Sequence, residues 1–170
     1  PYDFLFVLGG AQDTWQEKEH TWMLEEKAAI REWVWDRAKP YFGVCLGHQL
    51  LCDALGGEVA LAAEPEVGVY DVSLTADGQA HGLFAGVESS NKVMQWHWAE
   101  VTRAPQEAKV LATSAQSAIQ AVAIDSHAIS TQFHCEFTPQ TMATWSSLPG
   151  YLDSLEKQNG AGAYRRLIDE

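Results

Sequence analysis

The chain has 170 residues, and its 23 Asp and Glu against 11 Lys and Arg give a formal net charge of −12. This acidic balance argues against sequence-independent binding to nucleic acid and against docking on anionic lipid, because both need clustered cations. Hydrophobic residues make up 46%, no apolar run approaches a bilayer span and three cysteines are too few for a disulfide scaffold, so one cytoplasmic domain over residues 1–170 is expected.

The first part of the chain alternates predicted strands and helices. Residues 4–8 form a continuous apolar run, which predicts a strand buried on both faces. A helical pattern covers residues 22–38, a second short strand is expected at 41–44, and a second helix at 46–55. This order implies βαβ crossovers and an α/β layer architecture.

The middle of the chain is rich in predicted strands that are separated by turn residues. A helix is then expected after Thr138-Pro139, where Thr would cap the helix and Pro would take its first position. A last helix is expected at residues 163–168. We interpret the middle region as a mixed or antiparallel extension of the sheet, built from five segments: 67–75, 92–98, 109–114, 118–124 and 128–133.

The sequence Gly43-Val44-Cys45-Leu46-Gly47 lies where a predicted strand meets a predicted helix. This spacing is typical of a nucleophile elbow, in which flanking glycines allow a turn so tight that the central side chain projects from the sheet edge. The position at a helix N-terminus favours the thiolate form of Cys45, and the N–H of Leu46 could donate to an oxyanion. The alternative is that Cys45 is a small buried hydrophobe, as most free cysteines are.

A second segment, His134-Cys135-Glu136, follows the last predicted strand. Residues two apart on an extended chain point to the same side, so Glu136 can accept a hydrogen bond from one nitrogen of His134 while the other faces a thiol. Cys135 must point away and is a poor candidate for chemistry. The alternative interpretation is a surface His–Glu pair on an edge strand.

Together these segments resemble the class I (triad) glutamine amidotransferases, and most closely the members similar to a GMP-synthase amidotransferase domain. The resemblance covers residues 3–145 and includes the family pattern Gly-x-Cys-x-Gly-x-Gln, followed by Gln-Phe-His-x-Glu. Two further segments match it in order. They are Leu8-Gly9-Gly10, similar to the family's oxyanion loop, and residues 93–97, similar to the segment whose backbone holds the substrate.

The resemblance implies a three-layer, flavodoxin-like sandwich with a mostly parallel central sheet and a Cys45, His134 and Glu136 triad. The thiolate would attack a γ-glutamyl amide, with N–H groups of Leu46 and near Gly10 as the oxyanion hole. No metal or organic cofactor is implied. The amino-acid end of the substrate is expected to lie against Gln49, Gln95, Trp96 and His97.

The sequence departs from the family pattern in two places. Cys135 stands where the family has Pro, and the N-terminal strand and helix that precede the residue 4–8 strand in the family are absent from this sequence. We therefore expect an N-terminally truncated domain. A synthase subunit that accepts ammonia, or further copies of the chain, are the expected partners. The alternatives are a free-standing γ-glutamyl peptidase that acts on a glutathione-like conjugate, and a non-catalytic scaffold.

Overall fold

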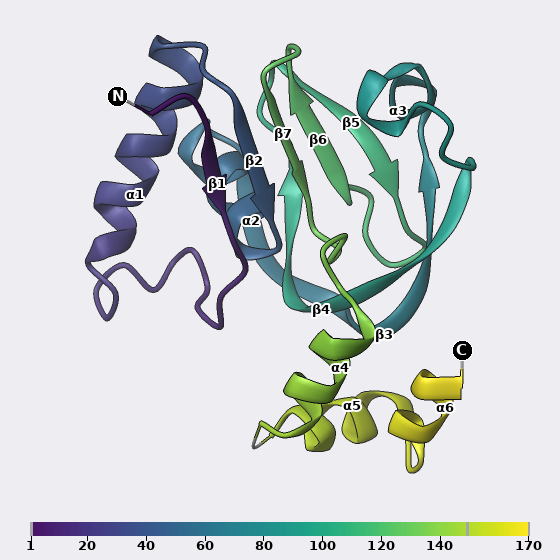
Figure 1. Ribbon diagram of the computed structural model, residues 1–170. Coiled ribbons are helices and arrows are strands. Elements are labelled where there is room, and N and C mark those ends of the chain that lie inside the picture. Colours follow the sequence, from purple (N-terminus) through teal and green to yellow (C-terminus); the bar gives the residue numbers. More distant parts are fainter. Residues whose placement is uncertain (1, 149, 170) are drawn as a thin grey trace.

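The computed structural model describes residues 2–148 and 150–169. In this part of the chain a seven-stranded sheet has the order β1-β2-β7-β6-β5-β3-β4 (Figure 1). The strands are β1 (Leu5–Val7), β2 (Tyr41–Val44), β3 (Glu58–Leu74), β4 (Ser90–Arg103), β5 (Ala108–Thr113), β6 (Ala121–Ile124) and β7 (Ala128–Thr131). The helices are α1 (Trp22–Arg31), α2 (Leu46–Ala54), α3 (Ala76–Ala80), α4 (Pro139–Ser146), α5 (Tyr151–Asn159) and α6 (Ala163–Asp169), with a π-helical turn η1 (Glu32–Asp36) and a 3₁₀ turn η2 (Gly82–Phe84).

The sheet is mixed, and its expected antiparallel extension is confirmed. β2 pairs in parallel with β1 and β7, whereas β7, β6, β5, β3 and β4 follow one another in antiparallel pairs. The parallel part is therefore smaller than expected, because short connections join β5 to β6 and β6 to β7 and permit only antiparallel pairing. β3 and β4 form a long two-stranded ribbon: β3 begins nine residues earlier than the predicted strand at 67–75, and β4 extends beyond the predicted strand at 92–98 at both ends.

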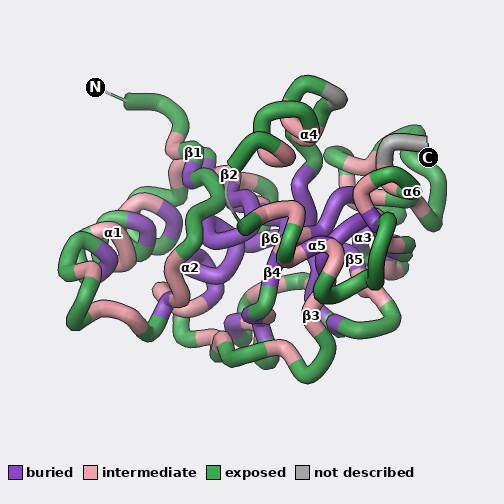
Figure 2. Tube along the Cα trace, turned by 90° about the horizontal axis from the view of Figure 1, so that it is seen from below, coloured by how far each residue is buried: buried purple, intermediate pink, exposed green. Residues whose placement is uncertain are grey.

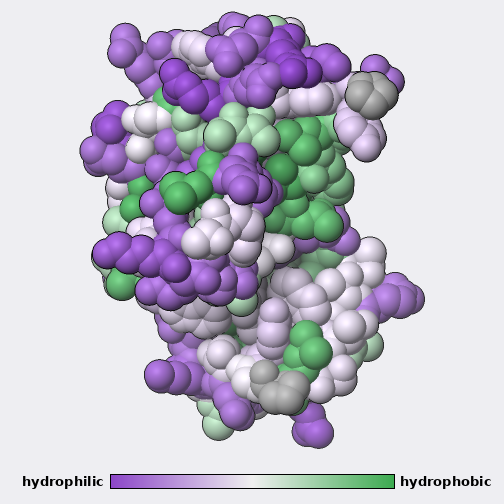
Figure 3. Space-filling view, turned by 90° about the vertical axis from the view of Figure 1, so that its left-hand side faces the viewer, coloured by the Kyte–Doolittle hydropathy of each residue, from purple (hydrophilic) through white to green (hydrophobic). Residues whose placement is uncertain are grey.

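The β1 strand lies at the edge of the sheet, and among the described residues it pairs only with β2. The sequence predicted burial on both faces, but Phe4, Phe6 and Leu8 are 55%, 48% and 57% exposed, and only Val7 is buried. The exposed residues alternate along the strand, so one face of β1 is left uncovered. An apolar run in a sequence cannot reveal whether its strand lies at the centre or at the edge of the sheet. Figure 3 views this side of the molecule and shows hydrophobic side chains gathered on it.

Helix α2 lies at the centre of the fold. Its residues from Leu46 to Cys52 are all buried, and it contacts α1, β2 and β7 (Figures 1 and 2). Buried apolar side chains of α1, such as Ile30, pack in the same core with Leu50 and Leu51 of α2. This core fixes the start of α2 against the ends of β2 and β7, which is where the candidate site lies.

The sheet curls until β4 meets the segment that follows β7. A single antiparallel bridge joins Met94 to His134, and the N–H of His134 donates to the carbonyl of Met94 at 2.9 Å. Helices α4 to α6 form a small cluster at this end of the molecule (Figure 1). The predicted cap of α4 is confirmed, because Thr138 and Thr141 form a reciprocal capping box. None of the helices in the described ranges has the length and apolar character needed to cross a membrane.

Candidate active site

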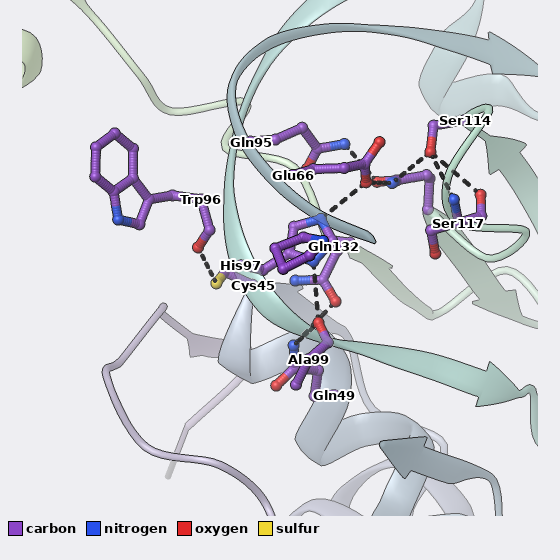
Figure 4. A network of polar contacts seen from close by, with 12 residues as sticks. Cys45, Gln49, Glu66, Gln95, Trp96, His97, Ala99, Ser114, Ser117 and Gln132 are labelled. Atoms are coloured by element: carbon purple, nitrogen blue, oxygen red, sulfur yellow. Dashed lines mark hydrogen bonds and ion pairs between the residues drawn. The ribbon is translucent and has the colours of Figure 1, made fainter. Parts of the chain in front are cut away.

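Cys45 occupies a tight turn between β2 and α2, as the elbow pattern predicts. Its backbone has φ 54° and ψ −107°, a conformation with positive φ that is uncommon for a residue other than glycine. The turn places the side chain at the N-terminus of α2 and leaves it 6% exposed. The Sγ atom lies 3.9 Å from the carbonyl oxygen of Trp96 on β4 (Figure 4).

The two glycines of the elbow are required by close packing rather than by their own dihedral angles. A Cβ atom at Gly47 would lie 2.2 Å from the carbonyl oxygen of Val7, and one at Gly43 would lie 2.6 Å from the carbonyl oxygen of Gly47. The hydroxyl of Tyr41 donates to the same Gly47 carbonyl at 2.8 Å from within the core. Tyr41 therefore supports the elbow, a role that its place in an apolar strand did not reveal.

His134 and Glu136 lie together beside the elbow. The Nδ1 atom of His134 is 2.7 Å from the carboxylate of Glu136, so Nε2 is the ring nitrogen free to face the thiol. A Cβ atom at Gly9 would lie 3.4 Å from Cys45 Cβ and 3.4 Å from Cε1 of His134, so the loop after β1 closes over both residues. Three predicted site residues are thus brought together from the end of β2 and from the segment after β7.

The electrostatics of this cluster favour a charged imidazole. Burial lowers the pKa of His134, but hydrogen bonds and charge interactions with Cys45 and Glu136 outweigh it and raise the pKa to about 9. Burial raises the pKa of Glu136, but the hydrogen bond and charge interaction with His134, together with a backbone hydrogen bond, outweigh it and hold that pKa below its usual value. At neutral pH the site therefore holds an imidazolium between a carboxylate and a sulfur atom.

We expect a titration of the His134 ring, followed by NMR, to have its midpoint near pH 9 instead of the usual 6.5. Because the negative charge of Glu136 contributes to this rise, Glu136→Gln should move the midpoint to lower pH. A midpoint that is unchanged in the Glu136→Gln variant would contradict the electrostatic role of this carboxylate.

The other two cysteines lie in different surroundings. Cys52 is fully buried in α2, and burial raises the pKa of its thiol far above the ordinary value. Cys135 is exposed, and partial burial of its thiol also raises the pKa. Cys45, unlike these two, is among the groups whose interactions raise the pKa of His134. Cys45 is therefore the best candidate nucleophile on structural grounds.

The loop after β1 approaches the start of α2 closely. A Cβ atom at Gly10 would lie 2.8 Å from Cδ2 of Leu46, so these two residues are neighbours across the elbow. Leu46 is the first residue of α2, where backbone N–H groups have no acceptor within the helix. The two residues predicted to supply the oxyanion hole are therefore neighbours in space, and the direction of their N–H groups stays a prediction.

The four residues predicted to hold the substrate lie in two environments. Gln49, Gln95 and His97 are at most 3% exposed, and their side chains bond to interior groups. Trp96 points the other way, towards the C-terminal helices, while its carbonyl faces the thiol. The side chains of Gln49, Gln95 and His97 are thus taken up by interior bonds, and on β4 it is the main chain at Trp96 that faces the thiol.

An aromatic cluster covers the imidazole, and no pattern in the sequence assigned Trp145 or Tyr151 to the site. The ring of Trp145 in α4 packs edge-on against His134, with centroids 5.1 Å apart and an angle of 89°. Trp96 stacks on Tyr151 of α5 at 5.1 Å and also contacts Trp145. Aromatic residues at helical spacing are typical of ordinary cores, so the pattern alone could not indicate this position.

A cavity of about 670 Å³ borders His134 between β4, α4 and α6. Its lining is mainly apolar, with Asn91 and Lys92 among the polar residues. Among residues 2–148 and 150–169, no three His, Cys, Asp or Glu side chains are grouped so that they could hold a metal ion. The site thus offers an apolar space beside the imidazole of His134.

A cysteine at a strand-to-helix elbow with a His–Glu pair beside it defines a class of α/β proteins with a thiol nucleophile site. Residues 1–145 match the family described as glutamine amidotransferase class-I. The protein belongs to this family.

Several relatives match most of this chain. The glutamine-hydrolysing GMP synthase of Aeropyrum pernix is 34% identical over 149 residues, which are 85% of this chain and 27% of that protein. A subunit of the glutamine-hydrolysing GMP synthase of Sulfurisphaera tokodaii is 36% identical over 136 residues, 79% of this chain and 68% of its own length. Gamma-glutamyl peptidase 2 of Arabidopsis thaliana is 24% identical over 142 residues, 83% of this chain and 56% of that protein.

The fold is also found among solved structures. A glutamine amidotransferase from Thermotoga maritima superimposes with a TM-score of 0.86 and 28% identity, and the match covers 99% of this chain and 69% of that one. The chain therefore spans only part of the length of the relatives that it matches, from about a quarter to about two thirds.

Proposed function

We propose that the protein hydrolyses a γ-glutamyl amide through a thioester on Cys45. The observation that carries this proposal is the place of His134, whose ring contacts Glu136 through one nitrogen while the other faces the elbow cysteine. Membership of the glutamine amidotransferase family supports the same chemistry. Glutamine is the first substrate to consider, and glutamate is the expected product.

In the first half of the reaction, the thiolate of Cys45 attacks the γ-carboxamide carbon and a C–S bond forms. The negative charge that develops on the amide oxygen is stabilised by the N–H of Leu46 and by the loop at Gly10. His134 then donates its proton to the leaving nitrogen as the C–N bond breaks, which releases ammonia or an amine. The raised pKa of His134 ensures that this proton is present at neutral pH.

In the second half, water hydrolyses the γ-glutamyl thioester. Neutral His134 takes a proton from water as the oxygen attacks the carbonyl carbon, and the C–S bond breaks. Glutamate leaves, and the thiolate and the imidazolium are restored. Glu136 fixes the ring orientation throughout and stabilises the imidazolium, so each half-reaction begins from the same geometry. No step in this scheme calls for a metal or an organic cofactor.

Two uses of this chemistry are supported by different observations. Relatives named as one subunit of a glutamine-hydrolysing GMP synthase support an amidotransferase whose ammonia passes to a separate synthase subunit. The alternative is a γ-glutamyl peptidase, favoured by the apolar cavity beside His134, which could accommodate a leaving amine larger than ammonia. The relative named Gamma-glutamyl peptidase 2 agrees with this second candidate. A non-catalytic scaffold is the remaining outcome of the test.

The test is covalent labelling with a glutamine-like chloroketone, followed by peptide mapping. We expect labelling of Cys45 that glutamine slows, with Cys52 and Cys135 of the same chain as internal controls. Rates of glutamate release from glutamine and from a γ-glutamyl dipeptide then separate amidotransferase from peptidase. Equal labelling of Cys45 and the exposed Cys135, without protection by glutamine, would refute the proposal and favour a scaffold.

A further inference from the structure

A buried charged cluster lies behind the site and is not part of the triad. Glu66 of β3 is 0% exposed, and its Oε2 atom is 3.0 Å from Nε2 of His97 on β4. The same oxygen accepts a hydrogen bond from Nε2 of Gln120 at 2.5 Å. Burying a carboxylate away from water costs free energy unless the charge is paired. The full burial of Glu66 beside His97 therefore requires an explanation.

The hydrogen-bond partners of His97 determine how many protons the pair holds. Its Nδ1 atom is 3.0 Å from the carbonyl oxygen of Ala99, which can only accept, so Nδ1 carries a hydrogen. Its Nε2 atom faces a carboxyl oxygen of Glu66, so a second proton lies between these two atoms. The pair is neutral as a whole, and loss of either residue would leave the other without its counterpart.

The cluster holds the segment of β4 from residue 95 to residue 99, called the 95–99 segment below. Gln95 donates to Gln120 at 2.7 Å, and the Ala99 carbonyl accepts from both His97 and Gln49. The interior side chains at 95 and 97 alternate with Trp96, whose carbonyl lies 3.9 Å from the Cys45 sulfur. Hydrogen bonds to the buried side chains of Gln95 and His97 thus hold the chain on both sides of the Trp96 carbonyl, which lies beside the Cys45 sulfur.

We propose that Glu66 and His97 are positioning residues, a buried pair that sets the main chain of the 95–99 segment for the amino-acid part of the substrate. This inference rests on the proposed function. The pair does not touch the reacting atoms, and it acts through the carbonyl of Trp96 and the neighbouring peptide groups. It therefore determines how tightly the substrate is held, while the Cys45–His134 pair determines how fast the bond is broken.

The variant Glu66→Gln tests the proposal, with Glu58→Gln as a matched control because Glu58 lies on the same strand but is exposed. We expect Glu66→Gln to raise KM for glutamine roughly tenfold or more with kcat within about threefold, the pattern of lost binding rather than lost chemistry. The control should keep both values. Alkylation of Cys45 by iodoacetamide, which has no amino-acid part, should stay within about twofold of wild type.

A second readout makes the test independent of turnover. The preference of Cys45 for a glutamine-like chloroketone over iodoacetamide should fall roughly tenfold in Glu66→Gln. If that variant folds poorly, the double variant Glu66→Gln, His97→Gln restores hydrogen bonding across the pair without charge, and the same loss of preference is expected. Thermal unfolding identifies the folded variants.

The outcomes separate the two proposals. Wild-type protein that shows no preference for the chloroketone and releases no glutamate would overturn the proposed function, and this inference with it. Wild-type protein with that preference, and folded variants with unchanged KM and unchanged preference, would overturn the positioning role alone. The positioning role would also be overturned if kcat and the rate of iodoacetamide labelling both fell by the same factor as kcat/KM. The pair would then act on the thiol and not on substrate binding.

Discussion

Replacing Cys45 with alanine is expected to lower kcat for glutamate release by roughly 10⁴-fold or more, because no other group can form the thioester. The remaining residues would still bind the substrate, so KM should change little. Measurement of glutamate release with a coupled assay, at saturating glutamine, gives the size of the effect. The elbow does not depend on the sulfur for its backbone contacts, so Cys45→Ala should fold normally.

The matched control for this prediction is Cys135→Ser. Cys135 is the exposed cysteine next to His134. Its replacement tests whether loss of a thiol near the site, other than the candidate nucleophile, affects activity. We expect its kcat to stay within about threefold of wild type. Turnover in Cys45→Ala above about one tenth of the wild-type value would contradict a thioester mechanism.

Replacing Gly47 with alanine should destabilise the protein by about 3 kcal/mol, the upper part of the range for overpacking a tight core. The added methyl group would lie 2.2 Å from the carbonyl oxygen of Val7, which belongs to the backbone of β1 and cannot rotate away. Either β1 or the start of α2 must move; β1 leads into the loop with Gly10, and α2 begins at Leu46, so the candidate oxyanion hole would be disturbed. Activity should therefore fall together with the urea midpoint.

The control for this change is Gly82→Ala at the start of η2. A Cβ atom at Gly82 would have no heavy atom within 4 Å among the surrounding residues, and its φ does not lie in the left-handed region. The free energy of unfolding of the Gly82→Ala variant should differ from that of wild type by no more than about 0.5 kcal/mol. If Gly47→Ala unfolds at the wild-type urea concentration, the elbow is less tightly packed against β1 than the structure indicates.

Much of the fold could be predicted because most strands and helices have clear local patterns. The elbow strand at 41–44 and the helix after Cys45 were placed correctly, as was the cap at Thr138. Helix α5 was missed because its helical pattern is mainly polar. The extent of parallel pairing was overestimated, because strand direction follows from connections and neighbours that a single sequence does not reveal.

The candidate site could be predicted only where its residues form a recognisable sequence motif. Cys45, His134 and Glu136 stand in recognisable spacings, and the structure brings them together. Glu66 lies just outside the strand predicted at 67–75, next to Glu64 and Pro65, and nothing in that stretch of sequence distinguishes a buried acid from a solvated one. Trp145 was missed for a similar reason, since its contact with His134 depends on how α4 folds back over the sheet.

The bridge between Met94 and His134 has a consequence for the order of folding. The strand β7 is the last in the sequence, yet it lies between β2 and β6, and only after it has entered the sheet can His134 reach β4. Contacts so distant in the chain form late, because loop closure must precede them. The imidazole can therefore reach its place beside the cysteine only once β7 has paired, and a chain in which β7 has not yet paired holds the elbow thiol without His134 beside it.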